Sequence, residues 1–201
     1  MLDSTVDTQY TATSLIPGQT YKFKVQSRNS VGFSPFSNEV SILAAQPPST
    51  PEAPTTVSSA DQIVVAWKQP YNGGVAITQY SVTFRKVDGV SFAPLEAYCD
   101  GSDADTIAQR VCYIPFTEFR NAPFELPWGA SIYARVQATN IMGDSPVSAS
   151  GNGGVITRIS DPPANLQSDD GISNAVVIGM NWDAPAEDGG LEILDYRLWW
   201  D

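Results

Sequence analysis

Apolar and polar residues alternate along several short stretches of the chain. Tyr21, Phe23 and Val25 alternate with Lys22, Lys24 and Gln26, and a period of two residues predicts a half-buried β-strand. The same spacing predicts inward-facing positions in three further strands: Ile63, Val65 and Trp67; Tyr80, Val82 and Phe84; and Ile132, Ala134, Val136 and Ala138. Residues 10–15 and 39–43 are predicted as shorter strands. The chain is therefore expected to be all-β.

One arrangement of residues occurs twice. A strand that ends at Trp67 is followed by Pro70, the pair Gly73-Gly74, and a second strand entered through Ile77 and Tyr80. The arrangement returns as Trp182, Pro185, Gly189-Gly190, Ile193 and Tyr196. Residues 140–146 likewise repeat residues 29–35. Recurrence at a long, fixed period indicates tandem domains.

These motifs resemble the fibronectin type III family. The pattern Leu15-x-Pro17-Gly18-x-x-Tyr21, followed by Val25, Asn29, Gly32 and Ser37, is similar to the E-F-G end of that domain, and Trp67 to Tyr80 is similar to its B and C strands. The resemblance implies immunoglobulin-like β-sandwiches. In style the repeats are similar to those of large surface or secreted proteins of protists.

The resemblance also assigns roles to single residues. Tyr21 matches the tyrosine corner, in which the hydroxyl bonds to the upstream backbone. The core signature would be Trp67, Tyr80, Trp182 and Tyr196. The middle repeat departs from the family, because Ile132 stands at the corner position and Tyr133 falls on the outward phase. Trp128 is expected to close that crossover instead.

The repeats divide the chain into three parts. Residues 1–46 supply strands E-F-G, residues 48–159 a complete domain with an insertion, and residues 160–201 strands A-B-C. Each half would leave an apolar sheet face uncovered, and together they make about one sandwich of ~100 residues. Three explanations stay open: a window on a longer covalent array, separate chains that complete each other head to tail, or halves that pair within one chain or are disordered. Proline-rich linkers join the parts and favour extended spacers.

Charge and composition exclude several functions. The net charge of -11, from 22 acidic and 11 basic residues, repels phosphate backbones and anionic membranes, so we expect no nucleic-acid partner. No apolar run approaches the ~20 residues of a membrane span, and Met1–Thr5 shows no secretory signal. The chain has no His, which removes Ser-His and Cys-His nucleophile pairs. We expect no enzyme and no catalytic residue.

The insertion carries the two candidate chemical sites. Cys99 and Cys112 flank a polar loop, and in a family common outside cells they suggest a disulfide and an oxidising compartment; two unrelated free thiols are the alternative. Asp100, Asp103 and Asp105 alternate on a tight loop, as oxygen ligands of Ca²⁺ do. A soluble acidic hairpin tip is the favoured explanation, and no other cofactor is implied.

The remaining candidates lie on the surface. Trp199 should face outward beside Trp200, where it could stack on a sugar, an Arg or a neighbouring domain, and Tyr133 is a second candidate contact. Ser49, Thr50 and Ser160 adjoin prolines and are candidates for O-linked glycans. The chain has no N-glycosylation sequon.

The sequence thus predicts an extracellular or cell-surface structural or adhesive protein. It would be a segment or subunit of a tandem fibronectin type III array that propagates end to end into a fibre, with copies of itself or adjoining repeats as partners. The alternative is a ligand- or carbohydrate-binding module of a receptor or secreted enzyme.

Overall fold

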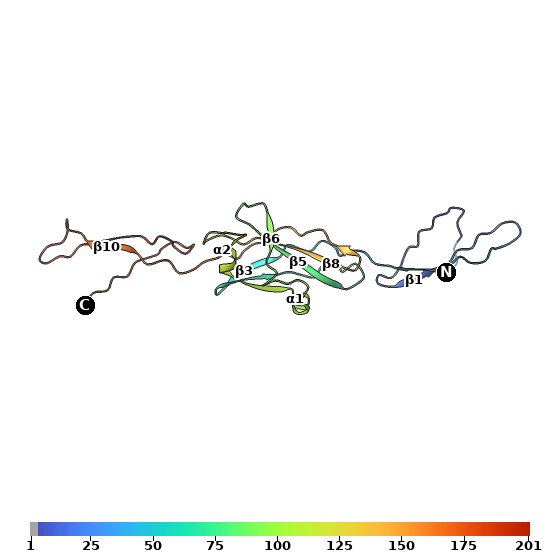
Figure 1. Ribbon diagram of the computed structural model, residues 1–201, viewed down its shortest axis with the longest axis horizontal. Coiled ribbons are helices and arrows are strands. Elements are labelled where there is room, and N and C mark those ends of the chain that lie inside the picture. The colour runs from blue at the N-terminus through green and yellow to red at the C-terminus, as the bar shows by residue number, and fades with distance from the viewer. Residues whose placement is uncertain (1–3) are drawn as a thin grey trace.

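The computed structural model describes residues 4–201, so part of the Met1–Thr5 stretch lies outside it. The molecule is elongated (Figure 1), with the N-terminal residues at one end, a central β-structure, and the C-terminal residues at the opposite end. Among the described residues, no helix is long and apolar enough to cross a membrane.

The central part is a sandwich of two antiparallel sheets. One sheet has the order β3-β4-β7 and the other β6-β5-β8-β9. The first contains β3 (Thr55–Ser59), β4 (Gln62–Ala66) and β7 (Val111–Pro115). The second contains β6 (Phe92–Pro94), β5 (Ile77–Arg85), β8 (Ala134–Asn140) and β9 (Gly143–Asp144). The expected all-β sandwich is confirmed.

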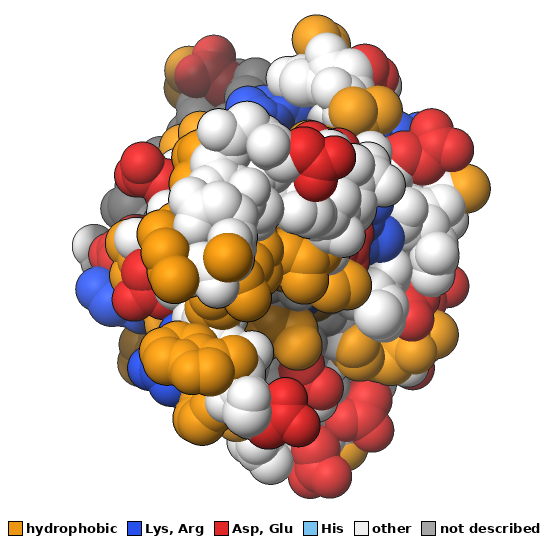
Figure 2. All heavy atoms as spheres, turned by 90° about the vertical axis from the view of Figure 1, so that its left-hand side faces the viewer, with side chains coloured by type: hydrophobic (Ala, Val, Ile, Leu, Met, Phe, Trp, Pro, Cys, Tyr) orange, Lys and Arg blue, Asp and Glu red, His pale blue; other side chains and the backbone are white. Residues whose placement is uncertain are grey.

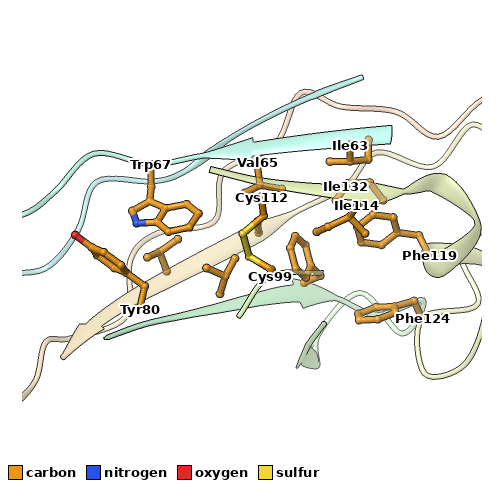
Figure 3. Packing of buried hydrophobic residues seen from close by; sticks show 14 of the residues in the cluster. Ile63, Val65, Trp67, Tyr80, Cys99, Cys112, Ile114, Phe119, Phe124 and Ile132 are labelled. Carbon is orange, nitrogen blue, oxygen red and sulfur yellow. A yellow bond between two sulfur atoms is a disulfide. The ribbon is translucent and has the colours of Figure 1, made fainter. Parts of the chain in front are cut away.

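The core lies between these two sheets (Figure 3), and its buried apolar side chains run from Ile63 to Ile156. The predicted alternation holds on β4, where Ile63 and Val65 are fully buried. Trp67 packs edge-on against Tyr80 with ring centroids 5.3 Å apart. Burial of such side chains contributes roughly 1.5–3 kcal/mol each, which makes the central sandwich the stable part of the chain.

The central part also contains two short helices that the sequence did not predict, one before β7 and one after it. They are α1 (Ala104–Gln109) and α2 (Phe116–Arg120). Phe119 on α2 is fully buried and packs edge-on against Phe84 and Phe124, with centroids 5.4 and 5.7 Å away. Helix α2 therefore extends the core at one end of the sandwich.

The predicted disulfide is confirmed. Cys99 and Cys112 are bonded and both are buried. Cys112 lies on β7, and Cys99 precedes the turn in which Gly101 accepts a hydrogen bond from the Tyr80 N–H at 2.9 Å. Figure 3 shows the sulfur bridge within the apolar core. It joins positions separated by 13 residues, and for a loop of this size the chain-entropy model gives about 3 kcal/mol.

Each end of the chain contributes a two-stranded antiparallel sheet. At the N-terminal end β1 (Thr20–Phe23) pairs with β2 (Val40–Leu43), and at the C-terminal end β10 (Ala164–Ser168) pairs with β11 (Met180–Asp183). The buried core cluster includes no residue of either sheet. Tyr21 and Phe23 on β1 are partly buried, whereas every residue of β10 and β11 is exposed.

Two predicted strands are absent from these ends. Residues 10–15 form no strand, and none is found in residues 184–201, where the repeated arrangement predicts a strand entered through Ile193 and Tyr196. In the central sandwich the matching strands β7 and β5 are held by ladders to β4 and β8. Neither end supplies that partner strand within the described chain, so no ladder forms there.

Candidate functional site

The N-terminal segment meets the central sandwich at a compact backbone contact, here called the first junction. The Gln46 N–H donates to the carbonyl of Gly73 at 2.9 Å, and the Ser49 N–H donates to the carbonyl of Tyr71 at 2.9 Å. The Tyr71 N–H returns a bond to Ser49 Oγ at 3.1 Å. The linker is thus paired to the loop between β4 and β5.

The C-terminal segment meets the sandwich through the same pattern, here called the second junction. The Arg158 N–H donates to the carbonyl of Gly189 at 3.0 Å, and the Asp161 N–H donates to the carbonyl of Glu187 at 2.9 Å. Arg158 holds the position of Gln46 in the repeat, and Gly189 holds the position of Gly73. Two separate stretches of linker therefore dock on equivalent loops with equivalent bonds.

Glycines face each other across both junctions. Gly18 lies against Gly74 in the first, and Gly129 lies against Gly190 in the second, all four with φ between 83° and 94°. A Cβ on Gly74 would lie 2.9 Å from the backbone N of Gly18, and one on Gly129 would lie 3.2 Å from Gly190 Cα. A side chain would push the backbones apart, so only glycine allows this close approach.

Side chains brace the two junctions differently. At the first, Asn140 Nδ2 donates to the carbonyls of Gln46 and Asn72 at 2.9 and 2.8 Å. At the second, Arg158 Nη1 lies 2.6 Å from Asp161 Oδ1, and the Arg158 guanidinium sits 5.6 Å from the Trp128 ring centroid.

Charge also distinguishes the second junction. The hydrogen bond from Arg158 lowers the pKa of Asp161, and the same bond, together with the charge of Glu187, raises the pKa of Arg158. Both side chains are partly exposed to water, which limits such a pair to a modest contribution. The backbone bonds and the glycine contact are common to both junctions and define them.

The hairpin that follows strand F is repeated in atomic detail. The Val25 N–H donates to Ser37 Oγ at 3.0 Å, and the Val136 N–H donates to Ser148 Oγ at 3.0 Å. In the same way, the Ser27 N–H donates to Ser34 Oγ at 3.1 Å, and the Ala138 N–H donates to Ser145 Oγ at 3.0 Å. One constant spacing along the chain relates every member of the first hairpin to its counterpart in the second. The N-terminal segment thus has the local structure of the central F–G hairpin.

The residues that the resemblance singled out are found in matching geometry. The Ile16 N–H donates to the Tyr21 hydroxyl at 2.8 Å, a bond to the upstream backbone as in a tyrosine corner. Trp182 and Tyr196 lie edge-on with centroids 5.5 Å apart, against 5.3 Å for Trp67 and Tyr80. Unlike the central pair, Trp182 and Tyr196 remain exposed.

The three acidic residues of the insertion serve its local structure. Asp103 caps α1 by accepting a bond from the Thr106 N–H at 2.9 Å, and Asp100 accepts the N–H of Ser102 at 2.8 Å. The Ser102 hydroxyl and N–H lower the pKa of Asp100. Asp105 lies in the first turn of α1. In residues 4–201 no group of three or more His, Cys, Asp or Glu is placed to hold a metal ion, so the Ca²⁺ expectation gains no support.

The surface candidates do not form one site. Trp199 is 86% exposed in the C-terminal segment. Tyr133 lies on the central sandwich, where the Arg85 guanidinium sits 3.4 Å from its ring centroid. Ser49 Oγ is engaged at the first junction, whereas Thr50 and Ser160 are exposed.

Sequence reasoning missed the junctions. It found the repeated pairs Gly73-Gly74 and Gly189-Gly190, but the glycines that contact them, Gly18 and Gly129, lie far away along the chain. The available signal was the repeat itself: the spacing between Gly18 and Gly129 is the same as the spacing between the two F–G hairpins.

Comparisons with known proteins agree with this geometry. The family model described as "Fibronectin type III domain" matches residues 1–42. Fibronectin type-III domain-containing protein 3A of Homo sapiens is 28% identical over 207 residues, covering 96% of this chain and 15% of that protein. A kelch domain-containing protein of Saccharolobus solfataricus is 33% identical over 76 residues, covering 37% of this chain and 10% of that protein.

Among solved structures, the chicken CNTN1 FN1-FN3 domains match with a TM-score of 0.42 and 18% identity, covering 84% of this chain and 53% of that one. The chain spans 15% of the length of its human relative. The likeness to protist surface proteins is not tested by these relatives and stays a prediction. The match over residues 1–42, the relatives and the repeated hairpin together support a fibronectin type III domain in this chain.

Proposed function

We propose that the chain is a non-enzymatic, extracellular structural or adhesive element whose fibronectin type III units stack in line through a repeated junction. In this role the protein supplies length and regular spacing along an array that propagates end to end. The mechanism is mechanical: each unit fixes the direction of the next.

The observation that carries the proposal is the equivalence of the two junctions. Each uses two backbone hydrogen bonds from linker to loop and one glycine contact, at equivalent positions of the repeat. A backbone contact found at one junction alone would reflect that linker's sequence, whereas the same contact at equivalent positions of both junctions is a property of the repeat. Units whose contacts are limited to their neighbours build quasi-linear arrays.

Two further features support the proposal. The Cys99–Cys112 bridge is buried in the core, and stable disulfides persist in oxidising compartments such as the outside of the cell. The chain contains no His, the commonest general base of enzymes. The alternative of a carbohydrate-binding module has less support, because Trp199 and Tyr133 do not lie in one site.

The junction is tested by closing the space between its glycines. Gly74→Ala and Gly190→Ala each place a methyl group against backbone atoms of the opposing turn. Small-angle X-ray scattering, at concentrations where light scattering shows single chains, should report a rod for the parent. The double variant should show a shorter maximum dimension and a broader distance distribution.

Gly89→Ala provides the matched control. Gly89 has a φ of 73°, like the junction glycines, but a Cβ there meets nothing within 4 Å. It carries the same backbone strain without the interdomain contact, so its scattering should equal that of the parent. If the double variant scatters like Gly89→Ala, the glycine contact does not align the units and the proposal fails.

The setting is tested separately with antibodies against the central sandwich. Labelling of intact, unpermeabilised cells or of secreted material, followed by electron microscopy, should show regularly spaced strings. Labelling confined to permeabilised cells would contradict the extracellular role.

A further inference from the structure

The outer side of the sheet β3-β4-β7, all of whose residues the structure describes, carries no charged side chain. Ile63 on β4 and Ile114 on β7 are fully buried, so the residues that alternate with them point away from the core. One row of outward residues crosses the middle of the sheet, since Val57 pairs with Val64 and Val64 pairs with Tyr113. The row on either side of it contains uncharged residues only. These three rows are here called the uncharged face.

The uncharged face is open to water and apolar at its centre. Val57 is 56% exposed and Tyr113 is 54% exposed. The opposite sheet differs, because Arg85 and Arg135 lie on its outer side, each with its guanidinium against an aromatic ring. The centres of protein interfaces are depleted of charge and enriched in Tyr. The uncharged face therefore has the composition of a contact surface.

The charge of the rest of the chain makes a second copy a suitable partner for this face. The chain carries a net charge of -11, and Figure 2 shows acidic side chains spread around the end of the molecule that carries the C-terminus. Like charges on facing surfaces oppose association. Two uncharged faces that pack together bring apolar side chains into contact and keep the acidic side chains outside the contact.

Charges at the two ends of the uncharged face set the direction of pairing. Asp61 lies at one end, in the turn between β3 and β4. Lys68 lies beyond the other end of β4, where its Nζ is 2.9 Å from a carboxylate oxygen of Glu52 and its side chain stays 79% exposed. Pairing with strands in the same direction would bring two Asp61 carboxylates together. Pairing in opposite directions brings each Asp61 to Lys68 of the other copy, which favours that arrangement.

We propose that the uncharged face is a lateral contact between two copies of this chain, packed sheet against sheet with their strands in opposite directions. The two-fold symmetry of such a contact sets the partner of each residue. Val57 and Tyr113 each face their own counterpart, and Ser59 of one copy faces Thr55 of the other. The proposal rests on the proposed function, and it names the surface through which arrays join side by side.

The size of the uncharged face makes a single contact weak. Three strands of five residues each, with spacings of about 4.8 Å and about 3.3 Å, make a face of roughly 240 Å². Two such faces bury roughly 480 Å² together, whereas a stable interface buries about 1,200–2,000 Å². Single chains therefore associate transiently. Along two aligned arrays the contact is repeated, and each contact raises the effective concentration for the next.

The test detects this transient contact between full-length chains by NMR. Chains that carry a nitroxide on Ser59→Cys are mixed with ¹⁵N-labelled parent chains; the described residues contain no other free thiol. Broadening of the amide signals of the parent then reports which residues approach Ser59 of another copy. We expect broadening centred on Thr55. A nitroxide on Ser81→Cys, which lies on the opposite sheet, is the control and should broaden no residue of the uncharged face.

Val57→Lys, introduced into both chains, blocks the contact. In the proposed pairing the two lysines at position 57 face each other, and like charges in a contact should reduce the broadening at least about tenfold. The substitution changes the net charge from -11 to -10, so the loss cannot come from greater overall repulsion. Ser81→Lys makes the same change in charge at an exposed strand position of the opposite sheet and should leave the broadening unchanged. Near-ultraviolet circular dichroism checks that both variants stay folded.

Each result supports or overturns the lateral contact. A parent that shows no broadening at the uncharged face at millimolar concentration overturns it, as does broadening that survives Val57→Lys. Broadening centred on Gln62 would show pairing in the same direction, and broadening confined to residues outside the face would show a different contact; both overturn the proposal. The scattering test of the junctions measures the dimensions of single chains, so either proposal can fail while the other stands.

Discussion

At the scale of single residues, serine hydroxyls replace ladder bonds after strand F. Ser148 is buried and accepts the N–H of Val136, while Ser37 makes the same bond to Val25 in an exposed setting. A proline in each of these stretches, Pro35 or Pro146, cannot donate a backbone bond. The hydroxyls keep the hairpin closed where the ordinary strand pairing is interrupted.

The two settings predict different costs for one substitution. Ser148→Ala leaves a buried N–H without its side-chain acceptor, so the free energy of unfolding of the central sandwich should fall by about 1–3 kcal/mol. In Ser37→Ala the Val25 N–H loses its acceptor but is open to water, so the free energy of unfolding should change by less than about 0.5 kcal/mol. Urea denaturation followed by Trp fluorescence checks both. Equal costs would mean that burial does not govern this bond.

At the scale of elements, α2 completes the core although it spans only five residues. Phe119 joins Phe84 and Phe124 in a group of edge-on rings. Helix α2 is therefore part of the packed sandwich, and removing the Phe119 side chain should act on the whole unit.

Phe119→Ala should lower the free energy of unfolding of the central sandwich by about 3–5 kcal/mol, the cost of emptying a buried aromatic site. Phe92→Ala is the control, since Phe92 is only partly buried beneath the Arg135 guanidinium, 3.9 Å from its ring centroid. It should cost clearly less. If Phe119→Ala leaves stability unchanged, α2 is not part of the core.

The elements also show what the sequence could predict. Strands β4, β5 and β8 were predictable because each buries one face and so alternates with a period of two. The helices were not, because α1 and α2 span six and five residues and leave too short a window for a helical period. Residues 10–15 have a strand pattern but form none, since strand formation depends on a partner as well as on sequence.

The candidate site was less predictable than the fold. The disulfide followed from two cysteines in a known type of domain, and Tyr21 from its position after Pro17-Gly18. The junctions required knowing that Gly18 meets Gly74 and Gly129 meets Gly190. Glycine has no side chain whose chemistry would indicate a contact partner, so the contact is visible only in the three-dimensional structure.

At the scale of the whole molecule, the two junctions should respond differently to acid. The pKa of Asp161 is lowered by its bond to Arg158. A carboxylate with a depressed pKa stabilises the folded contact above its ordinary value of 3.8, and this contribution is lost as the pH falls through the lower, folded-state value. The bonds that define the first junction involve backbone groups, Ser49 and Asn140, none of which titrates in this range.

Acidification from pH 7 to below the ordinary pKa of 3.8 should therefore loosen the second junction before the first. Proteolysis by pepsin at low pH, with mass spectrometry of the fragments, should show cleavage near residues 158–163 ahead of cleavage near residues 46–51. Asp161→Asn removes the titrating group, so its second junction should be cut at the same rate across this range. Near-ultraviolet circular dichroism must show the central sandwich intact throughout. If the first linker is cut sooner, the ion pair is not what distinguishes the junctions, and their shared backbone bonds and glycine contacts account for the alignment alone.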